Sequence, residues 1–174
     1  MRHHVKHYFR RHEPKGHVHL HLKSCIGAIL AMSAVGALAT VTHLPLLIAP
    51  FGASAVLLFG QPKSPLAQPA NVIGGYFVAA LLALGVTMFF PGIWLAGAVG
   101  VGLAIALMLA LRVTHPPAGA VPLVAIAGQM NGAVLLEVVM IGSALLVAIA
   151  TLHHLIPPRQ QYPIRIEESP APVE

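Results

Sequence analysis

The chain has 174 residues, of which 57% are hydrophobic and 9% are charged, with a formal net charge of +5. A water-soluble domain carries about 25% charged residues, so this composition excludes an ordinary soluble fold. The charges also avoid the middle of the chain, because Lys63 is the only one in 24–111 and Glu137 the only one in 113–158. Lipid is the solvent that suits such a pattern, and we expect an all-α membrane protein.

Polar ends flank the apolar part of the chain. We predict a basic, histidine-rich segment at 1–23, a transmembrane domain at 24–156 and a proline-rich tail at 157–174. Basic residues before the first apolar run place the N-terminus in the cytoplasm by the positive-inside rule. That run has no signal-peptide cleavage site followed by a soluble domain. We therefore expect a multi-pass protein of the bacterial inner membrane with both termini in the cytoplasm.

Four apolar runs are long enough, or nearly so, to cross a bilayer, since about 20 helical residues span the hydrocarbon core. They are 24–42, 71–90, 93–111 and 132–156. Two further apolar runs, 44–60 and 113–128, are interrupted by proline and glycine. The six segments thus form two similar halves, each with a span, a broken or half helix, and a second span.

The two broken runs share a short motif. Pro50-Phe51-Gly52-Ala53 in the first run matches Pro117-Ala118-Gly119-Ala120 in the second. If all six segments cross the membrane, every Lys and Arg lies on one side and the two repeats are inverted. The alternative has four spans plus two re-entrant segments. The charge asymmetry favours six membrane segments.

The broken runs are also the strongest candidates for a substrate site. Pro116 and Pro117 block continuation of the preceding span, and Pro117 suits the first turn of a new helix. Free N–H groups at such a helix start carry partial positive charge and favour an anion. Corresponding broken segments in two halves are typical of transporter sites. The candidate substrate-binding residues are Pro50, Gly52, Ala53, Ser54, His115, Pro117, Ala118, Gly119 and Ala120.

Four polar residues are candidates for gating or coupling. Arg112 either attracts an anion or anchors a helix end at the headgroups. Glu137 is the one acid within a predicted span, and intramembrane carboxylates are functional candidates. Gln68 and Asn71 either gate a pathway or cap the next helix. His115, one of the substrate-site candidates named above, either titrates near neutral pH or serves as a neutral hydrogen-bonding group at a helix start.

Aromatic and histidine side chains near span ends predict interfacial positions. Tyr76, Phe90 and Trp94 are of the kind that anchors helices at the headgroups. His153 and His154, near the end of the last span, are expected at the same interface.

Three motifs in order give a resemblance to a known family. The His115-Pro116-Pro117 signature, the stretch APFGASAVLLF at 49–59 and the stretch PLAQP at 65–69 together resemble the HPP family of integral membrane proteins. The resemblance extends over residues 20–156 and implies a transmembrane domain, usually described for that family as four helices. Members from cyanobacteria and plastids are associated with nitrite transport, so the resemblance implies nitrite as the leading substrate.

The first functional hypothesis is therefore a transporter or channel for a small inorganic anion. An alternative is metal-cation transport or binding, because imidazoles suit zinc, copper and nickel. The histidines concerned are His3, His4, His7, His12, His17, His19 and His21. Another alternative is a non-transporting membrane assembly module that packs through its glycines.

Partners and chemistry follow from the same patterns. We expect contact with the lipid bilayer and a homo-oligomer, because six short segments make a thin-walled pore. The sequence contains no phosphate loop, nucleophilic triad or structural metal site, so we expect no enzyme, no cofactor and no nucleic-acid partner.

Overall fold

A computed structural model describes residues 16–128 and 130–164, and every regular element in these residues is helical. A broken helix lies between two longer helices in the first half of the chain, and the same order of longer, broken and longer helix follows in the second half. The helices are α2 (Val18–Thr42), α3 (Ala49–Ala55), α4 (Pro69–Phe89), α5 (Trp94–Ala110), α6 (Val121–Ala127) and α7 (Gly132–Leu155). A π-helical turn, η1 (Val56–Gly60), extends α3, while the 3-10 turns η2 (Pro65–Ala67) and η3 (Pro116–Ala120) precede α4 and α6.

Three of these helices, α2, α4 and α7, are long and apolar enough to cross a membrane. They confirm three of the predicted spans, although α2 begins at Val18, within the segment predicted to be basic and cytoplasmic. Helix α5 has 17 residues, and the helical stretches Ala49–Gly60 and Pro116–Ala127 are shorter still. The number of crossings, six or four, stays a prediction.

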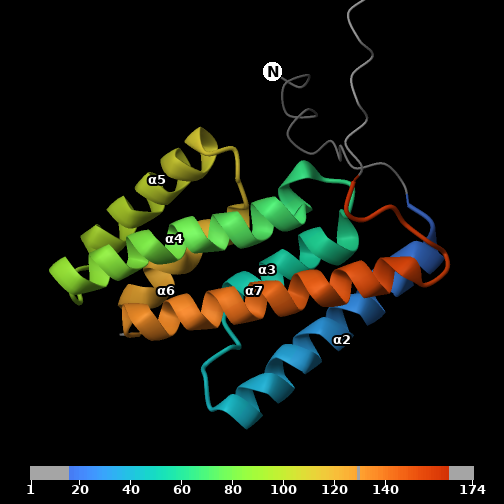
Figure 1. Ribbon diagram of the computed structural model, residues 1–174, viewed down its shortest axis with the longest axis horizontal. Coiled ribbons are helices and arrows are strands. Elements are labelled where there is room, and N and C mark those ends of the chain that lie inside the picture. Colours follow the sequence, from blue (N-terminus) through green and yellow to red (C-terminus); the bar gives the residue numbers. More distant parts are fainter. Residues whose placement is uncertain (1–15, 129, 165–174) are drawn as a thin grey trace, which may run out of the picture.

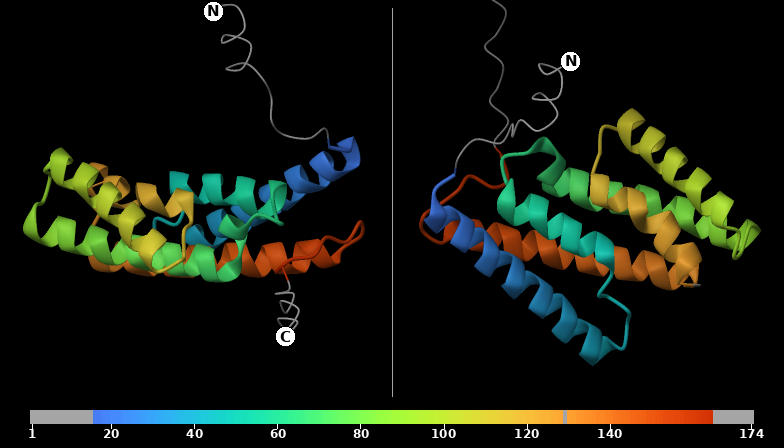
Figure 2. Two further views of the ribbon diagram at one scale, coloured as in Figure 1. Left: turned by 90° about the horizontal axis from the view of Figure 1, so that it is seen from above. Right: turned by 180° about the vertical axis from the view of Figure 1, so that it is seen from behind.

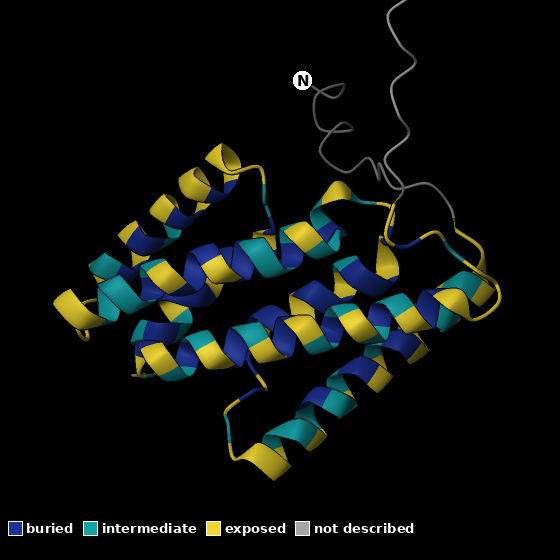
Figure 3. Cartoon of the chain, in the orientation of Figure 1, coloured by how far each residue is buried: buried dark blue, intermediate teal, exposed yellow. Residues whose placement is uncertain are grey.

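Helices α4 and α7 lie side by side at the centre, with α2 packed on α7 and α5 packed on α4 (Figure 1). Buried residues lie on the facing sides of these helices, whereas their outer sides are exposed (Figure 3). Large apolar side chains such as Leu30, Leu103 and Leu152 belong to the exposed surface. Helices that face lipid on their outer side are expected to have such a surface.

The broken helices α3 and α6 lie behind α4 and α7 and begin near the middle of the molecule. From there they run towards opposite ends, as the view from behind shows (Figure 2). Each follows a stretch without helix, 43–48 before α3 and 111–115 before η3. Helix α3 also packs against η3, so the beginnings of the two broken helices meet inside the protein.

Prolines account for where several of these helices begin. Pro50, Pro69 and Pro122 lie in the first turns of α3, α4 and α6, and η3 opens with two prolines. A proline in the first turn costs no helical hydrogen bond, because that N–H has no partner within the helix. Gly52, expected to interrupt its run, instead lies within α3.

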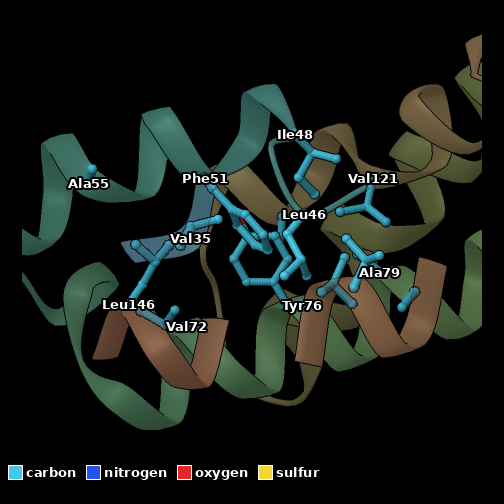
Figure 4. Packing of buried hydrophobic residues seen from close by; sticks show 14 of the residues in the cluster. Val35, Leu46, Ile48, Phe51, Ala55, Val72, Tyr76, Ala79, Val121 and Leu146 are labelled. Carbon is cyan, nitrogen blue, oxygen red and sulfur yellow. The ribbon is translucent and has the colours of Figure 1, made fainter. Parts of the chain in front are cut away.

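The core is tightest where α3 meets α4 and α7. The rings of Phe51 and Tyr76 pack edge to face, with centroids 5.3 Å apart and planes at 70°, and Leu46 lies beside them (Figure 4). On the other side, the Phe51 ring occupies the space that a side chain at Gly142 of α7 would need. Glycine at this position is what lets α3 approach α7.

Candidate functional site

Ser54, Tyr76 and His115 meet in the core of the protein, and each has 0% of its surface exposed. They come from α3, from α4 and from the residue before η3. Ser54 Oγ lies 2.7 Å from Tyr76 Oη and 2.8 Å from His115 Nε2. We call these three residues the core cluster. Through it, the two broken runs are joined directly by the hydrogen bond between Ser54 and His115.

The hydrogen-bond pattern fixes the tautomer of His115. Its Nδ1 lies 2.8 Å from the carbonyl oxygen of Leu66, which can only accept, so Nδ1 donates. In the neutral ring Nε2 then accepts the proton of the Ser54 hydroxyl. Ser54 Oγ has no second proton to give, so it accepts from Tyr76 Oη. One neutral arrangement therefore gives an acceptor to every donor in the core cluster.

Two residues of α4 hold the backbone beside His115 in place. A Cβ atom on Gly75 would lie 2.7 Å from His115 Cβ and 3.0 Å from the Val113 carbonyl oxygen, so only glycine allows this approach. One turn earlier, Asn71 Nδ2 donates to the Thr114 carbonyl oxygen at 3.1 Å. The spacing of four residues puts Asn71 and Gly75 on one face of α4.

The structure brings together only part of the predicted substrate site. The residues that line the inside are buried, and the others are exposed on the outer side of the broken helices. Pro50, Ser54, His115, Pro117, Ala118 and Gly119 are buried, whereas Gly52, Ala53 and Ala120 are exposed. Open space lies beside both glycines: nothing is within 4 Å of a Cβ atom on Gly52, and only Ile105 Cγ1, at 3.9 Å, is near one on Gly119.

The four gating candidates are divided between the start of α4, where Gln68 and Asn71 lie, and two exposed positions. Arg112 and Glu137 are exposed, and Arg112 has a left-handed backbone with φ of 59°. Gln68 Nε2 donates to the carbonyl oxygens of Pro62 and Ser64, and its Oε1 accepts from the backbone N–H of Ile164. Gln68 thus ties the turn before α4 to the chain that follows α7.

The capping alternative for Gln68 and Asn71 is wrong. Gln68 occupies the N-cap position of α4, but its side chain makes no capping hydrogen bond. Asn71 lies inside the helix and uses its side chain to bind Thr114 of the other half. Both side chains hold separate segments together instead.

Tyr76 was missed as a site residue, because the sequence suggests a headgroup anchor. The structure corrects this interpretation, since Tyr76 is fully buried in the core cluster. A usable signal exists in the sequence: a buried phenol needs a hydrogen-bonding partner, and Ser54 is one of few hydroxyl groups in the apolar runs. The sequence gives no sign that the Leu66 carbonyl binds His115, because this contact depends on how the chain before α4 folds.

A second aromatic cluster lies at the end of the molecule where α7 finishes. The end cluster consists of Phe59, His153, His154 and Tyr162, with ring centroids 5.3 to 6.1 Å apart. The two histidines are 7% and 1% exposed, so they lie inside the protein rather than at the lipid interface.

Hydrogen bonds attach this end cluster to the first half of the chain. His154 Nε2 donates to the Leu58 carbonyl oxygen at 2.8 Å, and Tyr162 Oη donates to the Ala67 carbonyl oxygen at 3.0 Å. Burial raises the pKa of the Tyr162 phenol, which therefore remains a donor. His153 Nε2 and His154 Nδ1 are buried without a partner.

No metal centre is formed in the part of the chain that the structure describes, where no group of three or more His, Cys, Asp or Glu side chains gathers. His17, His19 and His21 are exposed around the start of α2. The other N-terminal histidines in the metal hypothesis, His3, His4, His7 and His12, lie outside the described residues.

Apolar, lipid-facing helices around a small buried polar centre define a helical transmembrane protein, consistent with the transporter type. The family described as "HPP, transmembrane region" matches residues 13–163. The chain belongs to this family, and the match confirms the resemblance drawn from the three motifs.

Two curated relatives come from Dictyostelium discoideum, and both are named transmembrane proteins. One is 41% identical over 90 residues, which cover 49% of this chain and 32% of the relative. The other is 42% identical over 84 residues, which cover 46% of this chain and 27% of the relative. The aligned residues thus span about a third or less of each relative's length. No solved structure matches the chain.

Proposed function

We propose that this protein transports a small inorganic anion, with nitrite as the leading candidate. The observation that carries the proposal is the buried hydrogen bond between Ser54 and His115, 2.8 Å long, where the two broken segments meet. Transporters place their substrate sites between discontinuous helices of two repeats, near the middle of the membrane. The association of related HPP proteins with nitrite supports that substrate.

The packing supports two inverted repeats, α2 to α4 and α5 to α7. Helix α2 packs on α7 as α5 packs on α4, and α4 and α7 pack on each other. Helices α3 and α6 begin near the middle and run to opposite ends (Figure 2). In our proposal all six segments cross a bacterial inner membrane, both termini are cytoplasmic, and the core cluster lies near the midplane.

The chemistry of the core favours an anion over a metal cation. Hydroxyl, imidazole and amide groups supply the polar atoms there, and the one acidic residue in 14–166, Glu137, is exposed on α7. Carboxylates and thiolates are the groups that hold cations most strongly. The exposed cation of Arg112, three residues before His115, would draw anions towards the second broken segment.

The side chains of Ser54 and His115 have no exposed surface, and in our proposal this arrangement is the closed state of the site. In our proposal the anion enters between α3 and η3 when the bond between these residues opens. The space beside Gly119 then accommodates it.

A direct test is nitrite uptake into liposomes containing the purified protein, compared with protein-free liposomes. Gly119→Leu places a bulky group in the proposed space, although its first atom meets only Ile105 Cγ1, at 3.9 Å. We expect uptake to fall by about tenfold or more, as for a blocked site. Gly102→Leu on the exposed side of α5 is the matched control and should leave uptake unchanged. Correctly folded protein that moves no small anion would refute the proposal.

We also propose that the protein forms a homo-oligomer through the outer side of the first broken helix. Gly52, Ala53, Val56 and Gly60 are exposed there on α3 and η1, and small residues allow close approach of helices in membranes. Light scattering from the purified protein in detergent would measure the oligomer, which Val56→Trp should weaken. A strictly monomeric wild-type protein would exclude this association.

A further inference from the structure

We propose that His115 is a proton-binding residue whose protonation opens the core cluster, so that the anion and a proton bind and move together. This inference rests on the proposed function and adds the coupling ion to it. It starts from the directions of the hydrogen bonds rather than from the histidine alone. The neutral ring donates from Nδ1 to Leu66 and accepts at Nε2 from Ser54.

A proton added to His115 can only bind Nε2, because Nδ1 already carries one. The new N–H then points at Ser54 Oγ, 2.8 Å away, and the Ser54 proton must turn elsewhere. Its nearest partner is Tyr76 Oη at 2.7 Å, so the Tyr76 proton must turn in its place. No other hydrogen bond of Tyr76 Oη occurs in the described part of the chain. Protonation thus leaves one buried donor without an acceptor.

The closed cluster offers nothing to balance the added charge. The elements packed around η3 are α3, α4, α5 and α6, and Tyr76 is their one ionisable side chain. On α7, which packs on α3 and α4, Glu137 is exposed, and His153 and His154 belong to the end cluster. The nearest charged residue in the sequence, Arg112, is exposed and has the same sign as a protonated histidine. A lone buried cation with an orphaned donor is unfavourable, so the closed structure holds His115 neutral.

An anion supplies what the protonated cluster lacks. It accepts the free proton of Tyr76 or Ser54, and its charge cancels that of the imidazolium. Without the proton, an anion in the core would face the lone pair of Nε2 and be repelled. Without the anion, the proton would create a positive charge that no negative charge balances. Each ligand therefore raises the affinity for the other, which is the condition for coupled binding. The proton comes from the water on the side to which the site opens.

Opening the bond between Ser54 and His115 separates the first broken helix from the residue that precedes the second. Ser54 belongs to the first broken helix, while His115 precedes the second. Leu66 and Tyr76 both belong to the first half, so the bond from Nδ1 to Leu66 also crosses between the halves and keeps the ring in place. His115 is therefore the residue through which the first broken helix and the start of the second are in contact.

The first experiment follows protons and nitrite in the same liposomes, which contain wild-type protein, sodium nitrite outside and a pH-sensitive dye inside. Flux in protein-free liposomes, which nitrous acid crosses by itself, is subtracted. We expect one proton to enter with each nitrite ion. Nitrite entry without protons would overturn the inference while leaving the proposed function intact, and no entry above the protein-free level would count against the function itself.

Variants separate coupling from packing. His115→Asn keeps an N–H to donate to Leu66 but cannot take up a proton, so an inward proton gradient should no longer accelerate uptake. The loss should be about tenfold or more, the size of a typical coupling between sites. His43→Asn is the matched control, because this exposed residue precedes the first broken helix and has a left-handed backbone that asparagine tolerates. Gradient-driven uptake that survives in His115→Asn would overturn the inference.

A measurement on wild-type protein avoids any folding defect of a variant. Nitrogen-15 spectra of histidine-labelled protein in detergent report whether each ring is neutral or protonated. We expect the His115 signal to be that of the Nδ1–H tautomer without anion and to become that of a doubly protonated ring when sodium nitrite is added at constant pH. A His115 signal that stays neutral with nitrite bound, or does not respond at all, would overturn the inference.

Discussion

The core cluster and the end cluster are built from similar parts but differ in how their polar atoms are satisfied. Each contains histidine and a tyrosine beside a phenylalanine of the first broken run, because Phe51 packs on Tyr76 of the core cluster and Phe59 belongs to the end cluster. In the core every donor has an acceptor, and the chain of bonds joins four separate segments. At the end, His153 Nε2 and His154 Nδ1 are buried without a partner.

Their surroundings differ as well. A groove of about 310 Å³ lies beside the end cluster and is bounded by residues of α2, by His153 and by the chain after α7. The core cluster is enclosed by α3, α4, α7 and η3. From this difference we infer that the core cluster requires its particular polar groups, whereas the end cluster is a packing contact that tolerates substitution. Matched substitutions should therefore lower the free energy of unfolding more in the core cluster than in the end cluster.

The largest loss is expected from Gly142→Ala, next to the core cluster. Its Cβ atom would overlap the ring of Phe51, which is fully buried and cannot move aside. Overpacking of this kind costs about 3 kcal/mol of unfolding free energy. Gly27→Ala crowds Phe59 and His153 in the end cluster, where the groove gives the ring room to shift, so its cost should be smaller.

Thermal unfolding in detergent, followed by helical circular dichroism, would measure both changes. Gly85→Ala on α4 is the control, since nothing lies within 4 Å of the added atom, and it should be neutral or slightly stabilising. Equal losses of stability in Gly142→Ala and Gly27→Ala would show that the rings of the two clusters accommodate an added atom equally well, which would contradict the proposed difference.

The next largest effect is expected when a single hydroxyl is removed from each cluster. Ser54→Ala leaves both Tyr76 Oη and His115 Nε2 without their partner, and buried groups left unpaired cost about 2 to 3 kcal/mol together. Tyr162→Phe leaves only the Ala67 carbonyl unpaired and should cost about 1 kcal/mol.

The same unfolding assay compares the two variants, and each nearly preserves the volume of the side chain. A larger loss for Tyr162→Phe than for Ser54→Ala would mean that the tail after α7 stabilises the protein more than the core cluster does.

Much of the fold could be predicted from local rules, whereas the pairing within the core cluster could not. The preference of proline for first turns predicted that helices begin at Pro50 and Pro117, and hydropathy predicted the three long helices. Tyr76 binds Ser54 across 22 positions, and Ser54 binds His115 across 61. Such distances in sequence leave no periodic pattern. Burial of the histidines in the last turn of α7 also depends on a tertiary contact, the fit of His153 against Gly27.

The smallest effect is expected from His154→Phe in the end cluster. The change removes the donor to the Leu58 carbonyl oxygen, but it also removes a buried Nδ1 that has no partner. An unpaired Leu58 carbonyl costs about 1 kcal/mol, but removal of the unpaired buried nitrogen offsets part of this cost, so we expect a net change below about 1 kcal/mol. The phenyl ring can keep its contacts with Phe59 and Tyr162. A loss as large as that of Ser54→Ala would show instead that the His154 ring carries a specific polar role, and the two clusters would then be of one kind.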